Sequence, residues 1–407
     1  MHPTRSRALT RFRWAAGAGL ATVALATTAC SAGGAAATDT HGLTGTPVKI
    51  GVLANVSGPT GASEASATKV FQAWAAHTNK GGGIAGHPVE VVVKDTKEDA
   101  PTAAAAARSL ISDKSVVAVV AASTSTDPAV GAVLADSGLP VTGGIGYNPT
   151  VWGKLKNWFG ITTTFPQVVN MQIASAKPVG GNAISVVACA EEPACVAAVP
   201  LFEAAAKAAG NTYSGTMQVA AAAPNYTAQC LDLVNRKVDF VQLSISPSVG
   251  VRVVKDCQTQ GYTGYFGSSA SAISPTLYHT ANIRLAGALN AFPWWADTAP
   301  VKAYRAAMAE EGVADNDSGQ PASTAMWASG ELFKKALTPA AGQASDTVTR
   351  QAVLAAYGKV KGETLDGLLP QPITFTADQP APPVNCYWLY QYQNGAFAGS
   401  AQPTCPS

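Results

Sequence analysis

The sequence predicts an α/β protein that folds as two doubly wound parallel-sheet lobes. Short apolar segments alternate with helical segments of about 10–15 residues, which is typical of a parallel sheet covered by helices on both faces. This alternation occurs twice along the chain. Roughly 360 residues also remain after the N-terminal segment discussed below, which is more than one typical hydrophobic core holds.

The first series begins at residue 48. Short apolar runs predict buried strands at residues 48–54, 89–93, 116–121 and 139–142. A helix is predicted after the first strand because apolar residues recur at helical spacing from Ala67 to Ala75, before the glycines at 81–83. An Ala-rich helix is predicted at 101–111. A third helix is expected with Asp127 as N-cap and Pro128 in its first turn, ending at Gly138.

The second series repeats this pattern. Strands are predicted at residues 183–188, 215–220, 240–245 and 262–266, and helices at 201–209 and 226–235. Ser246-Pro247 and Ser274-Pro275 each predict a helix start, with a capping hydroxyl followed by a first-turn proline. After residues 285–292 the pattern becomes mostly helical, with segments at 300–310, 322–337 and 347–360. The chain then ends in an aromatic segment at 386–392, and Asn394-Gly395 predicts a hairpin turn after it.

Residues 1–29 have the layout of a secretory signal peptide. Four arginines precede an apolar stretch at 14–26, no acidic residue occurs before Asp39, and the stretch is shorter than the ~20 residues of a membrane span. The small residues before Cys30 resemble the lipobox of bacterial lipoproteins, although Thr27 stands where a leucine is usual. We therefore expect an exported protein with a lipidated Cys30 and a flexible tether over residues 30–46. The alternative is ordinary secretion with cleavage nearby.

Charge and cysteine content limit the possible partners. Removing the four signal arginines leaves 23 basic residues against 25 acidic ones, so we expect no nucleic-acid partner. Six cysteines remain besides Cys30, an even number that an oxidising compartment favours. Fifteen pairings are possible, and pairing of neighbours is geometrically easy because each pair lies on adjacent elements. No C-x-x-C motif or histidine cluster indicates a metal, so no metal or other cofactor is expected. The six are Cys189, Cys195, Cys230, Cys257, Cys386 and Cys405.

Polar loops follow three strands of the first series. They read Asn55 to Pro59, Ser123 to Thr126, and Gly143 to Pro149. Because open α/β sheets bind ligands at the carboxyl ends of their strands, these hydroxyls and glycine-exposed amides suit a carboxylate. The alternative is that these residues only cap helices and form turns.

Several of these segments resemble the branched-chain amino-acid-binding family, the type I periplasmic binding proteins that serve ABC importers. The resemblance rests on Val48 to Leu53, Ser57 to Gly61, Asn79 to Val89, Asp95 and Ser123 to Ser125. It implies two lobes joined by three hinge crossings, with lobe 1 at 47–163 and 290–370 and lobe 2 at 164–289 and 371–407. It also implies a monomer that captures a small molecule between its lobes and delivers it to an ABC permease without catalysing a reaction.

The resemblance also implies which residues contact the ligand. In the first lobe the matching positions are Ser57, Ser123, Thr124, Gly144 and Tyr147. The second lobe departs from the family, because the acid that usually pairs a ligand ammonium is replaced around Ser269, and we expect Glu191, Ser246 and Ser269 to contribute instead. The first-lobe positions for a carboxylate or another polar head are therefore kept. An ammonium buried without the usual acid would be unpaired, which disfavours a standard amino acid.

Other functions fit the sequence less well. The segment from Gly144 to Pro149 fails the dinucleotide pattern G-x-G-x-x-G, and the S-x-x-K match at Ser66 lies inside an amphipathic helix with no K-T-G after it. Trp294 and Trp295 either line the ligand site or pack where the chain crosses between lobes. A sensory module that reports its ligand to a membrane signalling partner remains the alternative, because one fold serves both functions.

Overall fold

The computed structural model describes residues 38–58, 61–190, 193–268 and 273–406, all of which belong to one compact unit, Ala36–Ser407. The predicted signal peptide, Cys30, Glu191 and Ser269 lie outside the described residues. Among the helices described, none has both the length and the apolar character that a membrane crossing requires.

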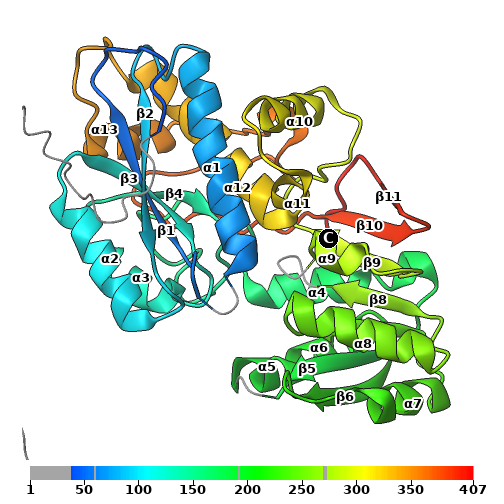
Figure 1. Cartoon of the computed structure of the whole chain (residues 1–407). Coiled ribbons are helices and arrows are strands. Elements are labelled where there is room, and N and C mark those ends of the chain that lie inside the picture. The colour runs from blue at the N-terminus through cyan, green and yellow to red at the C-terminus, as the bar shows by residue number, and fades with distance from the viewer. Residues whose placement is uncertain (1–37, 59–60, 191–192, 269–272, 407) are drawn as a thin grey trace, which may run out of the picture. The chain divides into compact units, whose positions relative to one another are not determined.

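The first sheet has four parallel strands in the order β2-β1-β3-β4 (Figure 1). Their β-branched runs explain the strands, and β3 is buried along its whole length because both of its faces are covered. Helices follow β1, β2 and β3, as predicted from the sequence. The elements are β1 (Val48–Ala54), α1 (Ala62–Lys80), β2 (Val89–Asp95), α2 (Ala100–Ser112), β3 (Val116–Ala122), α3 (Asp127–Leu134) and β4 (Val141–Gly144).

The start of α3 differs from the expectation. Thr126, not Asp127, is the N-cap, and Asp127 is the first residue of the helix. Asp127 is buried and accepts a hydrogen bond from a tryptophan side chain, so its carboxylate does not cap the helix. By contrast, Asp99 caps α2 by accepting from the backbone N–H of Thr102 at 2.8 Å.

The second sheet has seven strands in the order β11-β10-β9-β8-β7-β5-β6, and strands β5 to β9 are parallel. The strands are β5 (Ala183–Cys189), β6 (Thr212–Val219), β7 (Phe240–Ser244), β8 (Tyr265–Ser268), β9 (Leu285–Leu289), β10 (Trp388–Gln393) and β11 (Ala396–Gly399). The helices are α4 (Phe165–Ala174), α5 (Pro193–Ala197), α6 (Val199–Ala208), α7 (Thr227–Asn235), α8 (Pro247–Thr259) and α9 (Pro275–Tyr278), with a 3-10 turn at Lys177–Val179.

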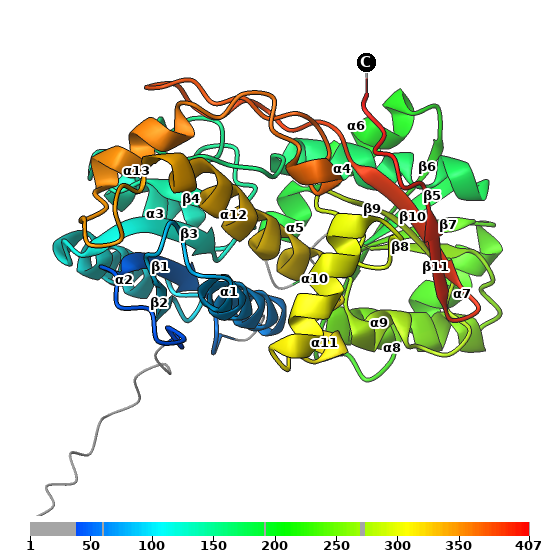
Figure 2. The same cartoon turned by 90° about the horizontal axis from the view of Figure 1, so that it is seen from above.

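The chain passes three times between the two sheets. It leaves β4 for α4 and β5, returns after β9 to helices that pack on the first sheet, and ends as β10 and β11 beside β9. Both views show α12 alongside α1 (Figures 1 and 2). The returning helices are α10 (Ala299–Glu310), α11 (Asp315–Ser318), α12 (Pro321–Leu337) and α13 (Arg350–Tyr357), with 3-10 turns at Thr338–Ala340 and Leu365–Gly367.

Helices α1 and α12 pack closely because a glycine lies at their contact. A Cβ atom on Gly330 of α12 would lie 2.3 Å from the ring of Trp74 on α1. The indole Nε1 of Trp74 also donates a hydrogen bond to Glu331 at 2.9 Å. The returning helices are therefore fixed to the first sheet through α1.

The terminal hairpin and the disulfides follow the sequence pattern. Asn394 and Gly395 both have positive φ, as the predicted tight turn requires, and β10 pairs with β11 in antiparallel fashion. Three disulfides join neighbouring cysteines. They are Cys189–Cys195, Cys230–Cys257 between α7 and α8, and Cys386–Cys405 at the C-terminal end.

Candidate ligand-binding site

The carboxyl ends of β1, β2 and β3 lie side by side in the first sheet. Ala54, the last residue of β1, pairs with Asp95 on one side and with Ala122 on the other. The residues that follow these strands are therefore neighbours, and the hydroxyls of Thr96 and Ser123 lie 3.0 Å apart. The loops that the sequence assigned to ligand binding do meet at one sheet edge.

The carboxylate of Glu64 joins two of these loops. Glu64 lies in the first turn of α1 and is buried. Its Oε2 accepts from the backbone N–H of Asn55, after β1, at 3.1 Å. Its Oε1 accepts from the backbone N–H and the hydroxyl of Thr124, after β3, each at 3.1 Å. Burial raises the pKa of Glu64 to about 7, against the effect of these hydrogen bonds and with a further contribution from Glu98.

A second carboxylate, Asp95, holds the tip of the loop after β1. It accepts from the hydroxyl of Ser57 at 2.5 Å and from the backbone N–H groups of Val56 at 2.9 Å and Lys97 at 3.0 Å. Partial burial acts to raise the pKa of Asp95, but the hydrogen bonds, first that from Ser57, outweigh it and lower the pKa. Ser57 is exposed at this edge with its hydroxyl directed to an internal acceptor.

The other predicted residues of the first lobe differ in exposure. Ser123 is buried and also accepts from the hydroxyl of Thr126 at 2.8 Å. Gly144 is buried, and its backbone N–H donates to the hydroxyl of Ser329 on α12 at 3.0 Å. Tyr147 is partly buried, with its ring 5.7 Å from that of Phe165. The structure therefore places these residues at one sheet edge, and their roles toward a ligand remain predictions.

A buried acid lies behind this edge at the start of α3. The Oδ2 atom of Asp127 accepts from the indole Nε1 of Trp152 at 2.6 Å, and its Oδ1 atom has no hydrogen-bond partner among the described residues. Burial raises the pKa of Asp127 well above its ordinary value. The hydrogen bond from Trp152 opposes this rise, the charge of Glu64 reinforces it, and a hydrogen bond from the backbone of Asn148 opposes it further.

In the second lobe only one predicted site residue is described. Ser246 is the N-cap of α8, and its hydroxyl lies 3.3 Å from that of Ser248. Glu191 and Ser269 lie outside the described residues, but the Cys189–Cys195 disulfide joins the two sides of the loop that contains Glu191.

Two of the few large apolar side chains that are exposed lie near the strand ends. Val56, which follows β1, is 41% exposed, and Val196, in the short helix after β5, is 43% exposed. Because the carboxyl edge of a parallel sheet is the usual place for a ligand, these side chains offer apolar surface where a ligand would lie.

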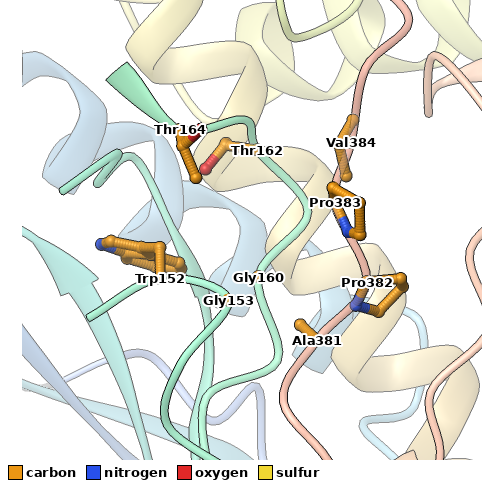
Figure 3. A pocket seen from close by; sticks show the side chains of 9 residues that line it. All are labelled: Trp152, Gly153, Gly160, Thr162, Thr164, Ala381, Pro382, Pro383 and Val384. Carbon is orange, nitrogen blue, oxygen red and sulfur yellow. The ribbon is translucent and has the colours of Figure 1, made fainter. Parts of the chain in front are cut away.

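Cavities also form elsewhere among the described residues, and two of them differ greatly in size. The smaller, of about 20 Å³, has room for a water molecule and no more. Figure 3 shows its lining: Trp152, Gly153, Gly160, Thr162, Thr164 and residues 381–384. The larger, of about 480 Å³, lies at the start of β9 and the end of β10, between residues 278–284 and 392–395. It is therefore at the amino-terminal edge of the parallel strands, opposite the carboxyl edge that carries the predicted site residues.

The two tryptophans that the sequence left undecided pack against the terminal hairpin. Trp295 stacks on Phe397 of β11 with ring centroids 4.2 Å apart, and Trp294 meets both rings edge-on. The exposed fraction of Trp294 is only 9%. This arrangement favours packing over ligand contact.

One cluster has ligand atoms close enough for a metal ion. The side-chain atoms of His77, Glu310 and Glu311 lie within 4.8 Å of one another. However, the ammonium of Lys80 lies 2.8 Å from Glu311 and 3.3 Å from Glu310. Lys80 already supplies positive charge to the two glutamates, so this cluster does not require a metal.

Sequence reasoning did not find Glu64. A signal was present, because Glu64 precedes Ala67, Phe71 and Trp74 at helical spacing and therefore lies on the buried stripe of α1. An acid on such a stripe is unusual without a partner. The partners, however, come from two loops whose proximity depends on the strand order.

Comparisons with known proteins agree with this fold. The family model described as "Periplasmic binding protein" matches residues 47–396. No curated protein sequence matches the chain. Among solved structures, a fatty acid ABC transporter substrate-binding protein from Thermomonospora curvata has a TM-score of 0.68 at 19% identity, over 89% of this chain and 93% of that one. A leucine-binding protein from Thermotoga maritima has a TM-score of 0.67 at 17% identity, over 88% and 99%. A substrate-binding periplasmic protein from Ralstonia solanacearum has a TM-score of 0.68 at 18% identity, over 87% and 100%.

Proposed function

The chain belongs to the family of periplasmic binding proteins, and from this premise we propose that it captures a small polar ligand between its lobes and delivers it to an ABC importer. We further propose that it acts outside the cytoplasm as a monomeric lipoprotein anchored through Cys30. The observation that carries the proposal is that the polar loops after β1 and β3 follow paired strand ends at the carboxyl edge of the first sheet and both donate hydrogen bonds to Glu64.

The ligand that we propose has a carboxylate head and an aliphatic body. The titles of two structural neighbours name a fatty acid and leucine, which share these two parts. In this chain the hydroxyl-bearing loops support a polar head, and exposed Val56 supports an apolar body. Only leucine carries an ammonium, and the sequence lacks the acid that usually pairs that group in the second lobe. A carboxylate without an ammonium therefore fits best.

A thermal-shift screen of the full chain tests this proposal. A ligand that binds only the folded protein raises the melting temperature by mass action. The panel contains octanoate, octanamide, L-leucine, L-leucinamide and benzoate. We expect the largest rise with octanoate. A shift only with L-leucine and L-leucinamide would show that an ammonium is recognised after all, and no shift with any compound would favour the sensory alternative or a different ligand class.

The anchor has its own test. If Cys30 is lipidated, the wild-type protein expressed in a bacterium sediments with the membranes, and the variant Cys30→Ala does not. Equal release of both proteins into the extracytoplasmic medium would support ordinary secretion.

A further inference from the structure

We propose that Glu64 is a positioning residue of the candidate site: its ionised carboxylate holds the loop after β1 to the loop after β3, and protonation of this carboxyl group loosens both loops and weakens ligand binding. This inference rests on the proposed function, because that function assigns ligand binding to these loops.

The hydrogen bonds of Glu64 show how the carboxylate acts. One oxygen serves the loop after β1 through the backbone N–H of Asn55, and the other serves the loop after β3 through the N–H and hydroxyl of Thr124. Hydrogen bonds to an ionised acceptor are about twice as strong as neutral ones. A proton on Oε2 would place a donor against the N–H of Asn55. A proton on Oε1 would reverse the bond to the Thr124 hydroxyl, which can accept, and would weaken Oε1 as the acceptor of the buried Thr124 N–H.

The loops held by Glu64 carry the predicted ligand contacts. Ser57 lies two residues beyond Asn55, and Ser123 directly precedes Thr124. Because Glu64 is on α1 and belongs to neither loop, a shift of its carboxylate changes the distance between the two groups of contacts. Small displacements of binding groups reduce affinity strongly, so a residue in this place controls binding without touching the ligand.

A purely structural role does not require a charge here. Glu64 is 8% exposed, and within the described part of the chain no Lys, Arg or His forms an ion pair with it. Keeping an uncompensated carboxylate buried is unfavourable, and such acids are concentrated at functional sites.

The surroundings of Glu64 are mainly acidic. Glu98 and Asp127 interact with it electrostatically, and burial together with Glu98 raises its pKa to about 7, so that both protonation states are populated near neutral pH. On α11, Asp317 is paired with Lys69 of α1 at 2.9 Å. The charged and titratable groups on the elements around the start of α1 include Lys69, Asp95, Lys97, Glu98, Asp127, Asp315 and Asp317.

Hydrogen exchange at pH 6 and pH 8 tests the loosening without any ligand. In the full wild-type chain we expect the protection of residues 52–58 and 121–126, corrected for the intrinsic effect of pH, to be up to about tenfold lower at pH 6, because the ionised fraction of a group with a pKa near 7 changes by that factor. Glu64→Gln should show the lower protection at both pH values, and Glu64→Asp should keep a dependence on pH. The control Glu203→Gln changes a partly exposed acid of α6, which pairs with Lys207 far from these loops in the sequence, and should behave as wild type.

Calorimetry with octanoate and L-leucine as probes tests the effect on binding. We expect wild-type affinity to fall up to about tenfold from pH 8 to pH 6, and the affinity of Glu64→Gln to be weak and independent of pH. Equal hydrogen-exchange protection of wild type at the two pH values would overturn the proposal that Glu64 holds the two loops together. The same dependence of protection on pH in Glu64→Gln as in wild type would overturn it as well. If protection of the loops falls at pH 6 but the ligand binds as tightly as at pH 8, or more tightly, the proposed effect of Glu64 on ligand binding is overturned. If neither probe binds wild type at pH 8, the proposed function fails for these ligands, and the proposed effect of Glu64 on binding fails with it. Hydrogen exchange still tests whether Glu64 holds the two loops together.

Discussion

Glu64 accepts both the backbone N–H and the side-chain hydroxyl of Thr124, each at 3.1 Å, although the two residues lie sixty positions apart in the sequence. The resemblance to the binding-protein family had implied that Thr124 contacts a ligand. In the structure an internal carboxylate already uses these two donors of Thr124, so the polar edge of the first lobe is held in place before any ligand arrives.

The substitution Glu64→Gln should stabilise the protein at pH 8. Because the folded pKa of about 7 lies above the ordinary 4.5, the folded state binds the proton more tightly, and global stability is lost as pH rises between these values. The loosening proposed above is a local change within the folded state, in which the carboxyl group stays buried and loses its hydrogen bonds to the two loops. The difference between the two pKa values corresponds to roughly 3 kcal/mol at full ionisation. We therefore expect the free energy of unfolding of Glu64→Gln relative to wild type to rise by about 2 kcal/mol between pH 5 and pH 8 in urea titrations. If the difference in the free energy of unfolding between Glu64→Gln and wild type is the same at pH 5 and pH 8, the carboxyl group of Glu64 does not ionise while buried in the folded protein.

Two neighbouring tryptophans allow a matched test of the Asp127 contact. Trp152 donates to Asp127, whereas the indole N–H of Trp158 is buried without a partner among the described residues. The two rings lie edge-to-face, 5.1 Å apart. We expect Trp152→Phe to lower the free energy of unfolding by about 1–2 kcal/mol more than Trp158→Phe, because it removes the side-chain donor to a buried carboxyl group. Equal losses in urea denaturation would mean that this hydrogen bond contributes nothing net.

The glycine at the contact of α1 and α12 should not tolerate a methyl group. Gly330→Ala places a Cβ 2.3 Å from the ring of Trp74, and we expect a loss of about 1–3 kcal/mol in the free energy of unfolding. Gly250→Ala, also inside a helix, meets its nearest atom at 3.7 Å and should stabilise the protein by up to about 1 kcal/mol. A similar effect of both substitutions on the melting temperature would show that α12 moves away from α1 at little cost.

The buried disulfide should contribute more to stability than the terminal one. Cys230 and Cys257 are fully buried and close a separation of 27 residues, whereas Cys386–Cys405 closes 19 and Cys405 is exposed. Chain entropy alone gives a difference of only about 0.3 kcal/mol, and the packing of the two buried sulfur atoms adds to it. The double variant Cys230→Ala/Cys257→Ala should therefore have a lower melting temperature than Cys386→Ala/Cys405→Ala. The reverse order would indicate that the end of the chain is the more important restraint.

The regular elements of both sheets could be predicted because their sequences carry strong local signals. The apolar β-branched runs of β1, β3 and β5 and the Asn394-Gly395 turn each specify one structure. Helix α4 was not predicted, since its apolar positions are interrupted and it begins with Phe165-Pro166 after a threonine-rich segment. The last predicted strand of the first series was placed two residues early, because β4 ends in two glycines with positive φ that no local pattern indicates.

The sequence could predict that the polar loops lie at one sheet edge, but not which of their hydrogen-bond donors are already used within the protein. Strand ends of a parallel sheet meet at one edge in any such fold, so the loops at Ser57 and Ser123 could be chosen from the sequence. Which hydrogen-bond donors of these loops remain available to a ligand depends on contacts between segments that are distant in the sequence. Ser329 on α12 binds the amide of Gly144, and Glu64 binds that of Thr124. These contacts follow from the packing of whole helices.

Calorimetry with octanoate and octanamide tests the central claim most directly, because the two probes share an aliphatic body and differ only in the head group. The account predicts that octanoate binds the full chain at pH 8 at least tenfold more tightly than octanamide. Equal affinity for the two probes, or binding of octanamide alone, would contradict a carboxylate-binding site.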